Sequence, residues 1–453
     1  MNMAYSRFRN SDFKINTYYK KFTDNLNEAK KHGKEVFTNE VRKLNNCYYA
    51  RKLQGDVYIK DIFINYWPSF KEKYLSQLTR SGLVEGIEKF ISCHNFDNGY
   101  LYYECPSCGD FYMMGFSCHS RMCPSCGKKY KDQRTIKVSE KCLEVPHRQF
   151  VFTVPYQLRT YFRRFRKPLL NILFRSVDES FNLLLKNHAP IAYKKEKRRL
   201  GYISFLHTFG RDMKWHPHIH VLLAERYVTK DGDIRKYDYF SFDFLRKAFQ
   251  NSLFHNIYIF YKVNRPKEEQ QEMYKLLKKL KEEYPNGYYV YGRKFSNEKT
   301  TTKDMTELTN YIARYASHPA ISERRITKCD IKNNTITWFY DPHEDDDIED
   351  EEKKKGRQYI TEDVFSFMKK ILIHVPDKGF QQVRYYGFYA NKYKDKIDNG
   401  KLFSDKELNK MKHDTIWING LMKAFGYNPT LCKCGTQMTL NYELSDFKNR
   451  GYG

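Results

Sequence analysis

Residues 206–224 read LHTFGRDMKWHPHIHVLLA, and their pattern is the most informative in the chain. Two apolar and β-branched runs, at 202–208 and 218–224, are predicted to be strands. They flank residues 210–212 (GRD), whose residue types favour a turn. The segment is therefore predicted to form a β-hairpin.

Three histidines converge on this hairpin. Because side chains alternate along a strand, His218 and His220 point to one face while Ile219 points into the core behind them. In a hairpin, His207 would lie roughly opposite His218. Three imidazoles so placed can hold one divalent ion; neutral histidines suit Mn²⁺ better than Mg²⁺, although Mg²⁺ serves when a phosphate and waters complete its shell. A surface run of histidines beside Pro217 is the alternative interpretation.

Strands and helices alternate around the hairpin. Helices are expected at 74–90, 128–144, 158–188, 241–256, 266–283 and 306–317, and further strands at 150–155 and 288–291. This order favours an α+β fold with helices packed on a sheet. The acidic run at 343–352 is expected to be a solvated loop.

The chain carries a large excess of positive charge. Its 453 residues include 80 Lys and Arg against 54 Asp and Glu, a formal net charge of +26. Such a balance favours a polyanionic partner, and nucleic acid is the commonest one because each neutralised phosphate releases a condensed counterion. A codon bias that raises Lys, Asn and Tyr together is the alternative explanation.

Composition also bears on location. Hydrophobic residues make up 41% of the chain, which is enough to build real cores. No apolar run approaches the roughly 18 residues that span a bilayer, and the first residues contain no apolar signal core. We therefore expect no membrane partner and a location in the bacterial cytoplasm.

Cysteine spacing predicts a structural zinc site. Two C-P-S-C pairs each place two thiolates on one tight turn, and two such turns facing each other make a tetrahedral site. The predicted ligands are Cys105, Cys108, Cys123 and Cys126, with Cys118 or His119 as possible alternates. Near the end of the chain, Cys432 and Cys434 could make half a site or a free pair. The scattered Cys47, Cys93, Cys142 and Cys329 are interpreted as small buried hydrophobes.

Two tyrosines stand out further along the chain. Tyr311 and Tyr315 are spaced i, i+4, which puts both hydroxyls on one face of a helix. In a chain with 38 tyrosines such a pair is expected by chance, so the spacing alone assigns no role.

Four motifs, in order from about residue 93 to 435, resemble IS91-type rolling-circle transposases of the HUH single-strand endonuclease superfamily. They are the zinc segment 117–126, the hairpin 206–220, the tyrosine segment 311–326 and the run VRYYGFYAN at 383–391. One departure is Met122, which stands where the family often carries a histidine.

The resemblance implies an HUH fold, an antiparallel central sheet with flanking helices, beside a small zinc ribbon. The expected regions are a helical N-terminal region (1–90), a zinc-binding domain (91–147), the nuclease with its tyrosines (148–330) and a C-terminal transposase region (331–453). It implies metal-dependent nicking and rejoining of single-stranded DNA, at element ends and target, through a 5′-phosphotyrosine. The implied roles are Tyr311 and Tyr315 as nucleophiles, His207, His218 and His220 as ligands of catalytic Mg²⁺ or Mn²⁺, and a structural Zn²⁺. Arg314, Arg324 and Arg325 are candidates for contacts with DNA phosphates, and a solvated charged face is the alternative interpretation of each.

Two other functions fit part of this pattern. A plasmid relaxase or replication initiator would use the same chemistry, but the zinc segment ahead of the nuclease argues against it. A non-catalytic zinc-ribbon protein that binds nucleic acid would not need the intact histidines and tyrosines.

Overall fold

The computed structural model describes most of the chain, and the fold is given for that part alone. The described residues are 7–9, 17–49, 57–120, 122–294, 307–308, 310–312, 320–342, 356–391, 402–415, 419, 428 and 430–447. Arg314 and Tyr315 lie outside them.

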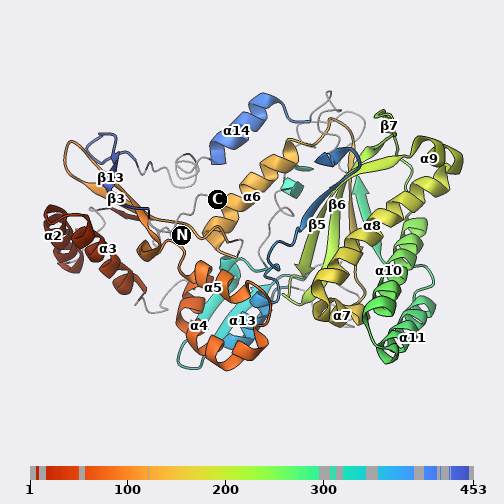
Figure 1. Cartoon of the computed structure of the whole chain (residues 1–453), viewed down its shortest axis with the longest axis horizontal. Coiled ribbons are helices and arrows are strands. Elements are labelled where there is room, and N and C mark those ends of the chain that lie inside the picture. Colours follow the sequence, from red (N-terminus) through yellow and green to blue (C-terminus); the bar gives the residue numbers. More distant parts are fainter. Residues whose placement is uncertain are drawn as a thin grey trace.

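A twisted antiparallel sheet lies on the right in Figure 1. Its strands, in spatial order, are β12 (Val383–Tyr386), β5 (Arg199–Phe209), β6 (Trp215–Val228), β4 (His147–Thr153) and β8 (Val290–Lys294), with the short β7 (Ile234–Lys236) paired to β6. Every pairing is antiparallel. The predicted hairpin is β5 and β6, and the expected α+β class with antiparallel strands is confirmed.

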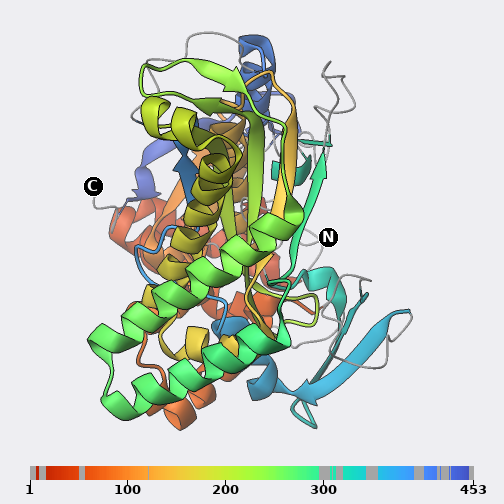
Figure 2. The ribbon, with the colours of Figure 1, turned by 90° about the vertical axis from the view of Figure 1, so that its right-hand side faces the viewer.

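Helices cover one face of this sheet and enclose the largest apolar core. They are α7 (Arg159–Arg164), α8 (Arg166–His188), α10 (Phe242–Asn264) and α11 (Lys267–Glu283), with the short α9 (Pro190–Glu196) after α8. Figure 2 shows α10 and α11 side by side in front of the sheet. One helix was expected over 158–188, but the chain breaks at Phe165, whose backbone leaves the helical region (φ −111°, ψ 53°).

The opposite face of the sheet carries a second apolar core. The end of α6 (Pro124–Ser139), the helical residues 307–312 described in part, and the 3₁₀ turn η5 (Gly387–Tyr389) pack against β5 and β6 there. Gly387 is required in this turn, because its φ is +55° and a Cβ would lie 2.1 Å from the Leu200 carbonyl oxygen. The VRYYGFYAN motif therefore supplies an edge strand and the turn that closes it against β5.

A third core joins helices far apart in the sequence. It contains α4 (Ile59–Tyr74), α5 (Leu83–Ile91), α13 (Val364–Leu372) and a ribbon of β9 (Ile326–Asp330), β10 (Thr335–Tyr340) and β11 (Gln358–Asp363). The single helix predicted over 74–90 is wrong. The chain instead makes a 3₁₀ turn after α4, and Gly82 adopts a left-handed conformation (φ +74°) just before α5.

A small four-stranded sheet lies at the far end of the molecule (Figure 1). It contains β1 (Arg7–Arg9), β3 (Phe111–Gly115), β2 (Tyr100–Glu104) and β13 (Thr439–Asp446), with α2 (Thr17–Lys31) and α3 (Lys34–Tyr49) packed beside it. The remaining helix, α14 (Asp405–Thr415), lies against α6. Segments from both ends of the chain thus share one sheet.

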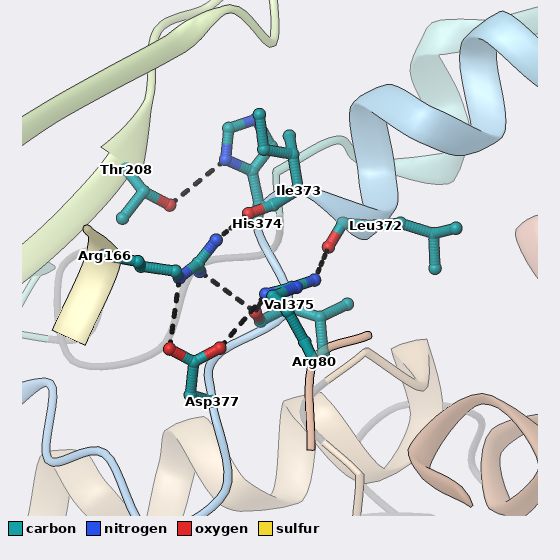
Figure 3. A network of polar contacts seen from close by, with 8 residues as sticks. All are labelled: Arg80, Arg166, Thr208, Leu372, Ile373, His374, Val375 and Asp377. Atoms are coloured by element: carbon teal, nitrogen blue, oxygen red, sulfur yellow. Dashed lines mark hydrogen bonds and ion pairs between the residues drawn. The ribbon is translucent and has the colours of Figure 1, made fainter. Parts of the chain in front are cut away.

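Buried polar contacts tie α13 to the β5–β6 hairpin (Figure 3). Arg80 and Arg166 donate to backbone carbonyls at the C-terminal end of α13 and share the carboxylate of Asp377. His374 Nε2 donates to the Met213 carbonyl at 2.9 Å, so its Nδ1 accepts from the Thr208 hydroxyl at 3.1 Å. Both His374 contacts flank the hairpin turn and hold it in place.

We expect the contribution of His374 to the free energy of unfolding to depend on pH. Burial lowers its pKa from 6.5 to about 4, so the unfolded state binds the proton more readily. The stabilisation is complete above pH 6.5 and is lost as the pH falls towards 4. Urea unfolding at several pH values should therefore show the stability gap between wild type and His374→Gln narrowing over that interval. A stability gap for His374→Gln that stays constant over that interval would contradict this account.

Candidate functional site

The pairing of β5 with β6 brings the three predicted histidine ligands together. His207 lies directly opposite His218 in the register, as predicted, and His220 lies opposite Phe205. Ile219 points to the opposite face and is fully buried in the largest core. The nitrogens of His207, His218 and His220 lie within 4.8 Å of one another.

These imidazoles suit one divalent ion. His218 Nδ1 donates to the His216 carbonyl oxygen at 2.8 Å, so its Nε2 carries the lone pair that a metal needs. His207 and His220 are buried and His218 is half-buried, which leaves the cluster open on one side. Small side-chain rotations would place one nitrogen of each imidazole at roughly 2.1 Å from a common metal ion, the length of a metal–imidazole bond.

Tyr311 lies beside this cluster. Its ring centroid is 6.5 Å from that of His220, and its hydroxyl donates to the Val221 carbonyl at 3.4 Å. The side chain is buried in the same core that covers this face of the sheet. The structure thus brings Tyr311 and the three histidines onto one face.

The predicted DNA-contacting arginines behave differently from one another. Arg324 is exposed. Arg325 instead donates to the Phe339 and Arg211 carbonyls, and its guanidinium lies 5.5 Å from the Trp338 ring centroid. Arg325 therefore links the β9–β10 ribbon to the hairpin turn, a structural use that the sequence did not indicate.

The cysteines form two separate clusters of four instead of the single site predicted. The first consists of Cys93, Cys118, Cys123 and Cys126, and the second of Cys105, Cys108, Cys432 and Cys434. Neighbouring sulfurs are 3.6–3.7 Å apart in the first and 3.5 Å apart in the second. A zinc ion with Zn–S bonds of about 2.3 Å sets tetrahedral edges of about 3.8 Å, so both sets fit the ion.

The prediction that Cys105, Cys108, Cys123 and Cys126 share one site is therefore corrected. Cys105 and Cys108 lie at the tip of the β2–β3 hairpin, whereas Cys93 and Cys118 lie at its base. Five-residue strands at about 3.3 Å per residue separate tip from base by roughly 17 Å. Of the alternates, Cys118 is in the first cluster and His119 is in neither. Cys93 is a cluster member, not merely a buried hydrophobe.

The second cluster joins two tight turns, each closed by a hydrogen bond from a glycine to a cysteine carbonyl. Gly109 N–H donates to the Cys105 carbonyl at 3.0 Å, and Gly435 N–H donates to the Cys432 carbonyl at 3.0 Å. Contacts with Thr436 lower the pKa of Cys434 to about 6, which favours the thiolate that zinc requires. The C-terminal cysteine pair, which the sequence left open, completes this cluster.

Comparison with known proteins follows the same motifs. A transposase zinc-binding domain model matches residues 62–154, and a Y2 transposase model matches residues 201–396. The transposase for insertion sequence element IS801 of Pseudomonas savastanoi pv. phaseolicola is 27% identical over 314 residues, covering 68% of this chain and 70% of that protein. The protein y4qJ of Sinorhizobium fredii, also named as a transposase, is 22% identical over 353 residues, covering 74% and 81%.

The chain belongs to the IS91-type transposase family. Both Cys93 and Cys118 of the first cluster lie inside the matched zinc-binding domain, whereas Cys432 and Cys434 lie beyond both matches. No solved structure matches the transposase. Among its described residues, no helix is long and apolar enough to cross a membrane.

In this transposase, α6 connects the first cysteine cluster to the histidine face. Cys123 is the N-cap of α6 and Cys126 lies in its first turn. At the other end of the helix, Val138 packs in the core that contains Tyr311. Zinc in the first cluster would therefore fix the start of a helix whose end lies in the apolar core on the histidine face of the sheet.

A buried lysine lies next to the first cluster. Lys60 Nζ donates to the Cys93 carbonyl at 2.5 Å, and the nearby thiols of Cys93, Cys123 and Cys118 partly oppose the lowering of its pKa by burial. Four thiolates around Zn²⁺ carry a net charge of −2, so a buried ammonium offsets half of it.

We predict two zinc ions per transposase chain, one in each cluster. Cys93→Ser and Cys432→Ser should each reduce the content by one ion, because a serine hydroxyl is a poor zinc ligand. Elemental analysis of the gel-filtered protein measures this directly. The Cys329→Ser control, a cysteine outside both clusters, should retain two ions. A Cys432→Ser protein that also retains two would contradict the second site.

Lys60→Met should weaken zinc retention at the first cluster by roughly tenfold, because the charge next to the thiolates is lost. The rate of zinc transfer to a chromogenic chelator reports this change. On the same helix, Lys71→Met removes an exposed lysine that pairs with Glu88, and its transfer rate should match wild type. Equal rates for both variants would remove the role given to Lys60.

Proposed function

We propose that this transposase is an HUH single-strand DNA endonuclease that nicks and rejoins element ends and target through a 5′-phosphotyrosine. The family assignment favours a transposase over a plasmid relaxase or replication initiator. The antiparallel sheet with helices on both faces agrees with an HUH fold for the nuclease.

Tyr311 lies next to His207, His218 and His220 on one face of the sheet, and this arrangement is the main support for the proposal. A nucleophile next to a metal site is the arrangement that phosphoryl transfer needs. The same face excludes much of the solvent, because His207, His220 and Tyr311 are all buried.

Mg²⁺ or Mn²⁺ bound by the three imidazoles would draw negative charge from the scissile phosphate. The protein's own residues then have defined roles. His218 is oriented by its bond to the His216 carbonyl. Arg324, which is exposed, would contact a DNA phosphate.

In the proposed step, a tyrosine hydroxyl oxygen forms a bond to phosphorus while the bond from phosphorus to the 3′-oxygen breaks. The phenolic proton is replaced by phosphorus, and the departing 3′-oxygen takes up one proton, so the step is balanced. Because the phosphodiester energy is retained in the tyrosyl ester, reversal of the step rejoins strands without ATP. Tyr311 and Tyr315 would hold one DNA end while another is cut.

We also propose the four-region organisation, with the zinc-binding domain at 91–147 and the nuclease at 148–330. Two contributions from residues 331–453 complete these units. β12 adds the edge strand next to β5, and Cys432 with Cys434 completes the second cysteine cluster. The C-terminal region would thus support both the nuclease and the zinc-binding domain.

A covalent-adduct assay tests the mechanism. The transposase is incubated with labelled single strands from its element ends and Mn²⁺ or Mg²⁺, then resolved on a denaturing gel and mapped by mass spectrometry. We expect an adduct on Tyr311 or Tyr315, its loss in the double Phe variant, and at least a roughly hundredfold lower rate for His218→Ala.

The controls separate chemistry from folding. His218→Ala should keep two zinc ions, and Tyr359→Phe, at an exposed site on β11, should form adduct at the wild-type rate. Adduct formation by the double Phe variant, or undiminished nicking by His218→Ala, would refute the mechanism.

A further inference from the structure

A large groove runs between the zinc-binding domain and β12. It has a volume of about 980 Å³ and is bordered by α5, by the loop that carries Cys118, by α6 and by the segment from Val375 to Asn391. This groove is separate from the three histidines, none of which lines it. Neither family match assigns it a role.

The groove walls carry more positive than negative charge. Lys89, Lys378, Arg134 and Arg384 line it, against two carboxylates, Glu85 and Asp377. Arg80 and Arg166 already pair with Asp377. Glu85 pairs with Lys89 at 2.6 Å and Lys378 at 3.7 Å, and these exposed ion pairs are weak enough to yield to a phosphate.

The remaining lining suits nucleotide bases better than a small apolar ligand. Phe380 and Tyr385 present partly exposed rings, and Gln381, Gln382 and Asn391 present amide groups. Pockets for small molecules are mostly apolar, whereas grooves for single strands combine cations along the backbone with aromatic rings that stack on bases.

The groove leads towards the histidine cluster. Val383, which lines the groove, pairs with Phe205 on β5. Phe205 precedes His207 by two residues, so the two lie roughly 7 Å apart along the strand. The Leu206 N–H, next to His207, donates to the Gln382 carbonyl at 2.8 Å. The groove floor is therefore hydrogen-bonded to the strand that carries the first histidine.

We propose that this groove binds the single-stranded DNA that flanks the scissile phosphate, between the zinc-binding domain and β12. The inference rests on the proposed function for the identity of the strand. It adds where that strand lies, and it gives the zinc-binding domain a part in DNA binding, because the Cys118 loop forms one wall of the groove.

The test is binding without cleavage. Fluorescence anisotropy of a fluorescein-labelled, mixed-sequence single strand is measured without added Mg²⁺ or Mn²⁺ over a range of salt concentrations. The double variant Lys89→Glu/Lys378→Glu should bind the single strand at least about tenfold more weakly. The slope of log K against log salt concentration should become shallower by about 1.4, the value for two lost phosphate contacts on a single strand.

The matched control is Lys275→Glu/Lys278→Glu. It makes the same change in net charge at two exposed lysines of α11, on the side of the sheet away from the histidines. Binding equal to wild type in this control and weak binding in the groove variant would support the groove. An equal loss of affinity in the groove variant and the α11 control, or no loss in either, would overturn the groove proposal.

Two further measurements complete the test. Zinc content and unfolding of the groove variant should match wild type, so that a binding loss is not a folding loss. An excess of unlabelled duplex that competes as well as unlabelled single strand would overturn the single-strand assignment. The binding assay scores no covalent adduct, so a negative result for the groove variants contradicts the groove proposal and leaves the tyrosine mechanism untested by it. A transposase that binds single strands in the groove but forms no adduct would contradict the tyrosine mechanism and not the groove.

Discussion

The register between β5 and β6 places the apolar core on one face of the large sheet and the three histidines on the other. Side chains on a strand alternate between two faces, so a slip of one residue would exchange the core and the site. With His207 opposite His218, Ile219 and Leu206 enter the core under α8 and α10, while the three histidines share the other face. The contacts of His374 with Thr208 and Met213 hold the turn that sets this register.

The cysteine clusters stabilise the part of the chain around the β2–β3 hairpin. The β2–β3 hairpin and its surroundings are too small to stabilise themselves by burial alone, so thiolate clusters hold chain segments that lie far apart in the sequence. The first cluster holds the start of α6, whose far end lies in the same apolar core as Tyr311. The second brings the C-terminal turn at Cys432 against the hairpin tip, where β13 continues the small sheet by pairing with β2. If both clusters bind zinc, metal binding and nuclease geometry are mechanically linked.

Several features could be read from the sequence because short-range chemistry controls them. The hairpin, the shared face of His218 and His220, and the position of His207 follow from strand periodicity and a turn of known residue types. Most helices were also predictable, although Gly82 divides what looked like one helix and Phe165 divides another. These breaks depend on a left-handed backbone and on a single non-helical residue, which apolar periodicity does not reveal.

The residues alone indicated seven of the eight clustered cysteines, the three histidines on one hairpin, and a net charge suited to nucleic acid, because these follow from spacing and composition; Cys93 was missed. Which cysteines act together became clear only from the fold, because that depends on the length of the β2–β3 hairpin and on the return of residues 430–446 to it, not on spacing. It also decided that Arg325 supports the hairpin turn while Arg324 stays exposed. The edge strand β12 and the groove beside it arise from residues nearly 180 positions away from β5, and no local pattern could place them there.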